Sequence, residues 1–271
     1  MAEKIGLKMK RIVIILLLLT ACQKNEKNYI SAFILRSVGT PWLYPEYYKE
    51  VYIYNKNGFP EVPTVQINDT NLPLYDYHEN WYRFIEFRKL DIDREYKMVV
   101  KTPQGMVFGE VYLPGEYEIL SPDSTYILKR DSSLKISWRK AYGAKWYWLD
   151  LTIEYDYEDT LGEWDDYEFW MDTILFDTFC IYEANRFFPP DIDTILEGEG
   201  VINIWALDGP PILPGSLGNI KGEGYGFFHC AYQPPERYFF VGTTPKERRI
   251  KSKGKEKLER LYRFQRDGIY R

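Results

Sequence analysis

The feature that most restricts the fold of this chain is an alternation of apolar and polar residues at period two, repeated from residue 30 to residue 241. The alternating runs are rich in Tyr, Val, Ile, Phe and Trp, which is typical of half-buried β-strands. The first half of the chain shows no helical periodicity with caps. We therefore predict an all-β fold, with strands at 30–38, 50–54, 64–67, 81–86, 96–101, 106–113, 133–138, 148–155, 169–182 (bent near Asp172 or Asp177), 200–207, 227–232 and 237–241.

Two turn-forming segments, 113–116 (LPGE) and 121–124 (SPDS), interrupt the strand pattern near the middle of the chain. Clusters of Pro, Gly, Asp and Ser commonly separate structural units. We therefore predict two antiparallel β-sandwich domains in tandem, an N-terminal β-domain at 29–116 and a second domain at 117–241. A basic tail at 242–271 follows them.

The start of the second domain has a recognisable order of residues. An alternating strand carries Leu134, Ile136 and Trp138, a short turn contains Ala144, and Tyr147 opens the next strand. This order resembles the fibronectin type III and related immunoglobulin-like modules, and the resemblance implies a β-sandwich. Residues 117–241 exceed the ~100 residues of such a module, and we expect the extra length to form long hairpins in an acidic region.

The first residues of the chain have the layout of an export signal. Lys8, Lys10 and Arg11 precede an apolar run at 12–19, and the sequence Leu-Thr-Ala-Cys ends at Cys22. Eight apolar residues span about 12 Å as a helix, far less than the ~30 Å hydrocarbon core of a bilayer, so a membrane-spanning helix is disfavoured. A signal peptide cleaved elsewhere is the alternative.

The segment ending at Cys22 resembles the lipobox of bacterial lipoproteins. The resemblance implies a signal peptide at 1–21, a lipidated (palmitate-bearing) Cys22 and a tether at 22–28. It also implies attachment to a membrane of the cell envelope through that lipid. Because Gln23 is not the aspartate associated with retention at the inner membrane, the outer membrane is favoured where there are two.

Two further cysteines, Cys180 and Cys230, lie in strand-like runs. In an exported protein an even pair of cysteines is a candidate disulfide. The alternative is two buried free thiols that pack as small apolar groups.

The region 150–200 contains sixteen acidic residues, and its only basic residue is Arg186. One interpretation is a hairpin with carboxylates on its solvent face. A second is a calcium site, because clustered carboxylate oxygens suit this ion. A third is a binding face on which aromatic rings stack on sugars or on a partner. The candidate calcium ligands are Asp156, Glu158, Asp159, Glu163, Asp165 and Asp166, and the candidate stacking residues are Trp164, Tyr167 and Trp170.

The sequence contains no recognisable catalytic set. His78 and His229 are isolated and fit no zinc spacing, and no nucleophile-elbow motif is present. We therefore expect a non-catalytic binding or assembly module with an envelope protein or glycan as partner, no nucleic-acid partner, and no cofactor apart from the candidate calcium. The alternative is a polysaccharide-active enzyme that uses paired carboxylates in the region 150–200.

The predicted tail is basic, whereas the chain as a whole has a negative net charge. From Lys246 onward it has eleven basic residues against four acidic ones. Residues 255–264 have a pattern compatible with a helix, with Leu258, Leu261 and Tyr262 on one face, and a solvated basic tail is the alternative. Such a tail suits anionic lipid headgroups, cell-wall polymers or the acidic surface of a partner.

Overall fold

The computed structural model describes residues 27–38, 45–190, 192–211 and 218–242. The predicted signal peptide, Cys22 and the basic tail lie outside the described residues. The described part is almost entirely β-structure, which confirms the predicted all-β fold class. In this part no helix is both long enough and apolar enough to cross a membrane.

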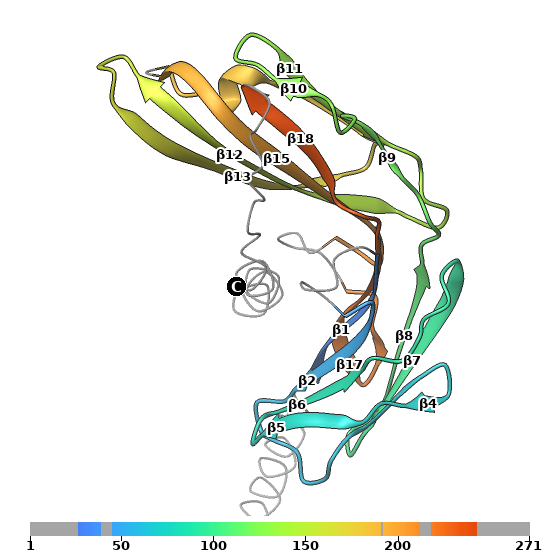
Figure 1. The fold of residues 1–271 in the computed structure, drawn as a ribbon. Helices are drawn as coiled ribbons and strands as arrows, with labels where there is room; N and C mark the ends of the chain where they lie inside the picture. The colour runs from blue at the N-terminus through green and yellow to red at the C-terminus, as the bar shows by residue number, and fades with distance from the viewer. Residues whose placement is uncertain (1–26, 39–44, 191, 212–217, 243–271) are drawn as a thin grey trace, which may run out of the picture.

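The described residues form three sheets (Figure 1). The large sheet has ten strands, and eight of them follow one path of hydrogen-bonded neighbours. That path is β10 (Ile127–Leu128), β18 (Arg237–Gly242), β15 (Ile192–Asp208), β17 (Gly224–Gln233), β1 (Asn28–Ser37), β2 (Tyr47–Tyr54), β6 (Trp81–Glu86) and β5 (Leu74–His78). The other two strands extend from β15: β12 (Trp146–Asp159) pairs with β15, and β13 (Trp164–Leu175) pairs with β12.

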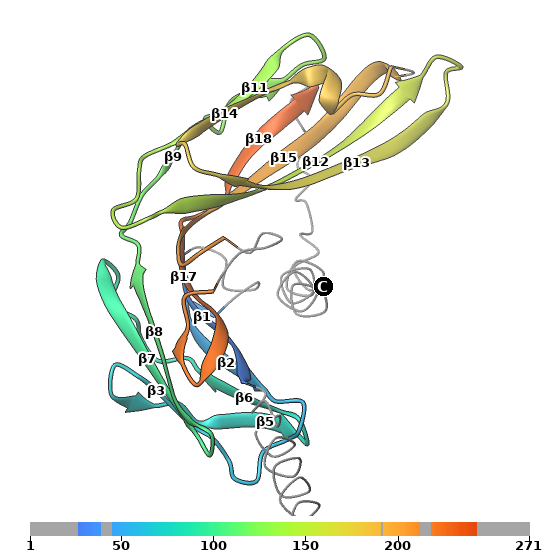
Figure 2. The same cartoon turned by 180° about the vertical axis from the view of Figure 1, so that it is seen from behind.

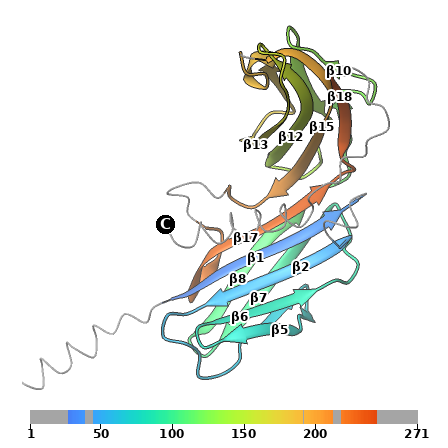
Figure 3. The same ribbon diagram turned by 60° about the vertical axis from the view of Figure 1, so that its left-hand side comes forward.

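The first sandwich forms where one end of the large sheet packs on a five-stranded sheet (Figure 3). That second sheet has the order β16 (Lys221–Gly222), β8 (Gly105–Leu113), β7 (Arg94–Thr102), β3 (Thr64–Ile67) and β4 (Thr70–Asn71). Alternate residues of each layer face inward, so that Ile30, Val51, Met98 and Val111 share one core.

The second sandwich forms at the other end of the large sheet (Figure 2). Strands β13, β12, β15 and β18 pack against a three-stranded sheet of β14 (Phe179–Glu183), β11 (Ser133–Trp138) and β9 (Ile119–Ser121), and a 3₁₀ turn at Ala184–Arg186 follows β14. Trp138 and Tyr147 meet edge to face in the core, with their ring centroids 5.3 Å apart.

The two sandwiches share the large sheet, in which strands far apart in the chain are neighbours. The end of β15 pairs with β17 at residues 206–208, and β17 pairs in parallel with β1 at the start of the described chain. Strand β17 falls in the range predicted for the second domain, but Phe228 and Cys230 belong to the core of the first sandwich. A smaller apolar cluster lies where the sheet passes from one sandwich to the other, and Leu35, Trp205 and Leu207 are among its members.

The expected strand at 169–182 is two strands. A bend at residues 176–178, which include Asp177, separates β13 in the large sheet from β14 in the three-stranded sheet. The chain therefore changes layers at this bend.

The candidate disulfide is not formed, and both cysteines in the described part are free thiols. Cys180 lies in β14 and packs against the core of the second sandwich, whereas Cys230 lies in β17 within the core of the first. Because the two residues belong to different cores, the strand-like runs around them do not become neighbouring strands.

Candidate binding face

The acidic region folds into one surface because β-strand side chains alternate between the two faces of a sheet. In β12 the odd-numbered residues, Leu149, Leu151 and Ile153 among them, are fully buried in the core of the second sandwich. The even-numbered residues of β12 therefore face the opposite side of the sheet, and the pairing registers bring residues of β13 and β15 beside them. We call this surface of β13, β12 and β15 the acidic face. Its carboxylates are Asp150, Glu154, Asp156, Glu158, Asp166, Glu168, Asp172, Glu197 and Glu199.

The carboxylates of the acidic face are arranged in rows across the strands. Glu154 stands between Glu168 of β13 and Glu199 of β15. One step along β12, Asp156 stands between Asp166 and Glu197. Directly opposite residues have Cβ atoms only ~5 Å apart, and like charges at such positions repel each other.

A shorter row lies on the other side, where Asp150 is between Asp172 of β13 and Asn203 of β15. None of the strands β12, β13 and β15 contains a lysine or an arginine. The strands that form the acidic face therefore carry no positive charge of their own, which makes the face a strong attractor of cations.

Two tryptophans stand among the carboxylates. Trp170 lies opposite Thr152 between two acidic rows, and its Nε1–H donates a hydrogen bond to Asp150 Oδ1 at 3.2 Å. Trp164 lies opposite Glu158 at the hairpin end of β13. The two residues are 40% and 71% exposed, respectively. Large exposed aromatic rings of this kind are well suited to contact a ligand or partner.

Thr152 has an unusual position in the middle of the acidic face. It is only 8% exposed, and its Oγ1 is buried with no hydrogen-bond partner among the described residues. Thr152 shares the side of β12 that carries Asp150 and Glu154, so its hydroxyl is directed toward the same face. A buried hydroxyl without a partner costs free energy, and this cost is removed when a donor or acceptor approaches it.

The candidate calcium ligands do not come together. Asp156, Glu158 and Asp166 lie on the acidic face, but Asp165 pairs with Tyr157 on the opposite face. Asp159 Oδ1 is used in the hairpin turn, where it accepts hydrogen bonds from the backbone N–H groups of Leu161 and Glu163, each at 2.8 Å. Across the described residues, no group of three or more His, Cys, Asp or Glu side chains is arranged to hold a metal ion.

The candidate stacking residues divide in the same way. Trp164 and Trp170 share the acidic face, whereas Tyr167 packs against the core with its ring 5.2 Å from that of Tyr155. We did not predict that Glu197 and Glu199 would join these residues. Their spacing of two residues in the run Glu-Gly-Glu-Gly at 197–200 was a signal that they share one face.

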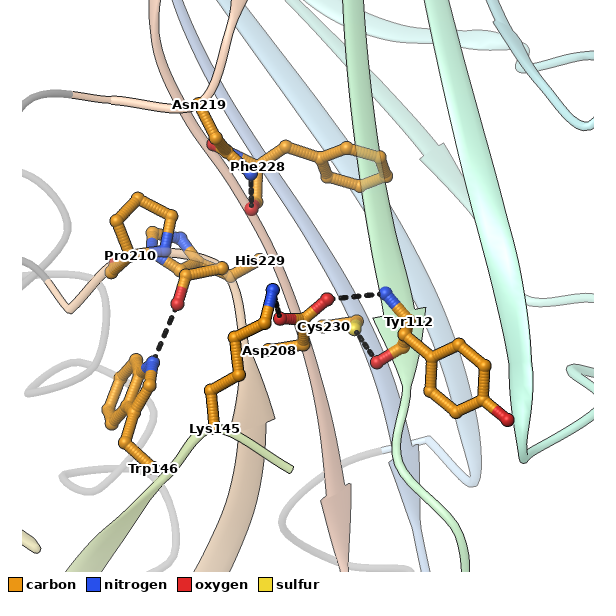
Figure 4. Close-up of polar contacts among 10 residues, drawn as sticks. Tyr112, Lys145, Trp146, Asp208, Pro210, Asn219, Phe228, His229 and Cys230 are labelled. Carbon is orange, nitrogen blue, oxygen red and sulfur yellow. Dashed lines mark hydrogen bonds and ion pairs between the residues drawn. The ribbon is translucent and has the colours of Figure 1, made fainter. Parts of the chain in front are cut away.

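A second cluster of polar groups joins the two sandwiches where β15 ends (Figure 4). Asp208 is buried, and its Oδ2 accepts a hydrogen bond of 2.6 Å from the backbone N–H of Tyr112 in β8. Its Oδ1 lies 2.6 Å from Nζ of Lys145, whose side chain is largely exposed. Asp208 thus ties the large sheet to the five-stranded sheet.

The neighbouring residues His229 and Cys230 point to opposite sides of β17 and do not form a catalytic pair (Figure 4). The buried Cys230 Sγ–H donates to the backbone oxygen of Tyr112 at 2.9 Å, and burial raises the pKa of this thiol well above its usual value. His229 Nε2–H donates to the Pro210 oxygen at 2.6 Å, and burial lowers the pKa of this imidazole to about 4. A neutral histidine and a protonated thiol held in this way have structural roles.

Comparisons with known proteins do not assign the chain to a family. No protein-family model matches it, and no curated protein does so. Among solved structures, it is similar to the fibronectin(III)-like modules of CbhA from Clostridium thermocellum. That match has 11% sequence identity and a TM-score of 0.25, and it covers 81% of this chain and 98% of that chain. The description of the fold therefore rests on the strand pairing given above.

Proposed function

We propose that this protein is a non-catalytic binding module of the cell envelope, anchored by lipid on Cys22, whose acidic face binds a lysine- or arginine-rich protein partner. One observation carries the binding role: three adjacent strands without basic residues bring carboxylates into rows on one face. Such a face attracts cations over a range set by salt screening. The β-sandwich fold is compatible with this role.

The position of the carboxylates favours binding over hydrolysis. A glycosidase needs one carboxyl group kept protonated, usually by burial in an apolar site. Asp166, Glu168 and Asp172 are instead exposed on the surface of a sheet. Glycan binding is the second candidate, because the exposed rings of Trp164 and Trp170 offer stacking surfaces beside hydrogen-bond acceptors.

The test of binding uses the full-length chain in nonionic detergent micelles, titrated by calorimetry with a decalysine peptide and with envelope glycans. We expect the peptide to bind, and its affinity to fall at least tenfold when NaCl is raised from 50 to 500 mM. The variant E154Q/E168Q/E199Q should lose this binding. The matched control E79Q/E110Q/E223Q removes the same charge from exposed positions on the first sandwich and should keep it.

The outcomes separate the candidates. Equal affinity in both triple variants would show that net charge alone acts, and would overturn the assignment of the face. Glycan binding without peptide binding would favour the second candidate, and glycan turnover would favour an enzyme. The anchor is tested separately by palmitate labelling in cells, which a C22A variant should abolish.

A further inference from the structure

We propose that the basic segment 243–271 of this chain docks on its own acidic face and covers it, so that an external partner has to displace it. The inference rests on the proposed function, because it names the occupant of the same face. Two features of the face carry it independently, namely the rows of carboxylates and the buried hydroxyl of Thr152 without a partner among the described residues.

The charge of the segment is complementary to the face. From Lys246 to Arg271 it has eleven basic and four acidic residues, whereas the strands β12, β13 and β15 have no basic residue. The segment also contains Leu258, Leu261, Tyr262 and Phe264. These apolar side chains suit a surface on which Trp170 stands between rows of carboxylates.

The chain leaves the described fold beside the face. Strand β18 ends at Gly242, and its last residues pair with β15, Phe240 with Glu199 and Val241 with Gly198. Residue 243 therefore follows a strand that pairs with β15 at Glu199, a carboxylate of the acidic face. A segment tethered at the edge of its binding site has a high effective concentration there, commonly in the millimolar range, so weak individual contacts are enough.

The segment is long enough to cover the face. The rows from Asp150 to Asp156 span about 20 Å along β12 at ~3.3 Å per residue, and three strands span about 10 Å across. The 29 residues from 243 to 271 reach about 43 Å as a helix and farther when extended. Free lysine amines along this length can meet carboxylates in successive rows.

The test is zero-length carbodiimide cross-linking of the full-length chain in detergent micelles, followed by peptide mass spectrometry. This reagent joins a carboxylate to a lysine amine only where the two touch. We expect links within one chain between Lys251, Lys253, Lys255 or Lys257 and carboxylates of the acidic face. Their yield should fall at least fivefold in 500 mM NaCl, a measurement that needs no variant.

Two variants and a matched control sharpen the result. The yield should also fall at least fivefold in E154Q/E168Q/E199Q and stay unchanged in the control E79Q/E110Q/E223Q. Reversing the charge of the segment in K251E/K253E/K255E should uncover the face and raise the affinity for decalysine at least tenfold. Circular dichroism at each step confirms that the variants remain folded.

Every other result overturns the inference. Links found only between two chains assign the face to a second copy, and links spread over carboxylates of the first sandwich show that no specific docking occurs. If cross-links to the face are absent while decalysine binds it, this inference fails and the proposed function stands. If decalysine does not bind even to the charge-reversed variant, the proposed function fails.

Discussion

The burial of His229 predicts a loss of stability in mild acid. The imidazole is only 4% exposed, and its Nε2–H is bound to the Pro210 oxygen. In the folded protein its pKa is about 4, against an ordinary value of 6.5. Between these two pH values the unfolded chain binds a proton that the folded chain does not, so stability present above pH 6.5 is lost as the pH falls toward 4. Integrating this difference from pH 7 to pH 5 gives about 2 kcal/mol for this one residue.

The measurement is urea unfolding followed by tryptophan fluorescence at pH 7, 6 and 5. In H229Q, whose side-chain amide keeps a donor toward Pro210, the stability difference between pH 7 and pH 5 should shrink by about 2 kcal/mol. Only the change with pH is compared, so a lower overall stability of the variant does not affect the result. The control H78Q replaces the exposed second histidine and should keep the full pH dependence. If H229Q loses as much stability between pH 7 and pH 5 as the unmodified chain, the burial argument is refuted.

Three further predictions concern stability and use the same urea assay. D208A leaves the buried N–H of Tyr112 without its acceptor and should lower the free energy of unfolding by about 2–4 kcal/mol. K145A removes a largely exposed partner and should lower it by about 1 kcal/mol or less. Equal losses in the two variants would contradict the role given to the hydrogen bond. Gly226 has φ +132°, and a Cβ added there would lie 1.9 Å from a backbone oxygen of β1. G226A should therefore lower the free energy of unfolding by about 3 kcal/mol or more. A loss below about 1 kcal/mol would show that β1 and β17 separate at little cost. F187A leaves a cavity at a fully buried position and should lower the free energy of unfolding by about 3–5 kcal/mol. W164A, at the exposed hairpin end, should change it by no more than about 0.5 kcal/mol. Similar values for the two variants would contradict the placement of Phe187 in the core.

The local strand pattern was enough to find most strands. The segments Thr64–Ile67, Trp81–Glu86 and Ser133–Trp138 begin and end where the alternation predicts. The pattern holds there because each segment buries one face and exposes the other, as a strand in a two-layer sandwich must. The short or exposed strands were missed for the same reason: every residue of β5 (Leu74–His78) is exposed, so it has no buried face to mark it.

Long-range pairing was beyond the reach of periodicity. Strand β1 pairs with β17 across almost 200 residues of chain, and Asn28 lies beside Gly224. Alternation states which side of a strand is apolar, but it does not state which other strand will cover that side or extend its sheet. Two segments far apart in the chain therefore meet in one sheet, and no local pattern in the sequence indicates that they do.

In the acidic region, the alternation of strand residues predicts which side chains share a face when each residue is assigned to one side of the sheet. Grouping acids by closeness in sequence put Asp159, Asp165 and Asp166 into one site, although alternation and turn geometry send them in three directions. Grouping the residues of each strand by odd and even number would have separated Tyr167 from Trp170 correctly, because successive residues of a strand face opposite sides of the sheet. Only the register between β12 and β15 was then missing, and it is the register that adds Glu197 and Glu199.

The alternation of β12 also separates residues that can bind a partner from residues that stabilise the core. In β12 the odd-numbered residues Leu149, Leu151 and Ile153 are fully buried and contribute to the core, whereas the even-numbered residues Glu154 and Asp156 belong to the acidic face. Mutual repulsion among the carboxylates is offset by burial on the other side of the sheet, so the core can support a face that is unfavourable by itself. Substitutions at Glu154 and Asp156 should therefore change what the protein binds with little loss of stability, and substitutions at Leu149, Leu151 and Ile153 should do the reverse.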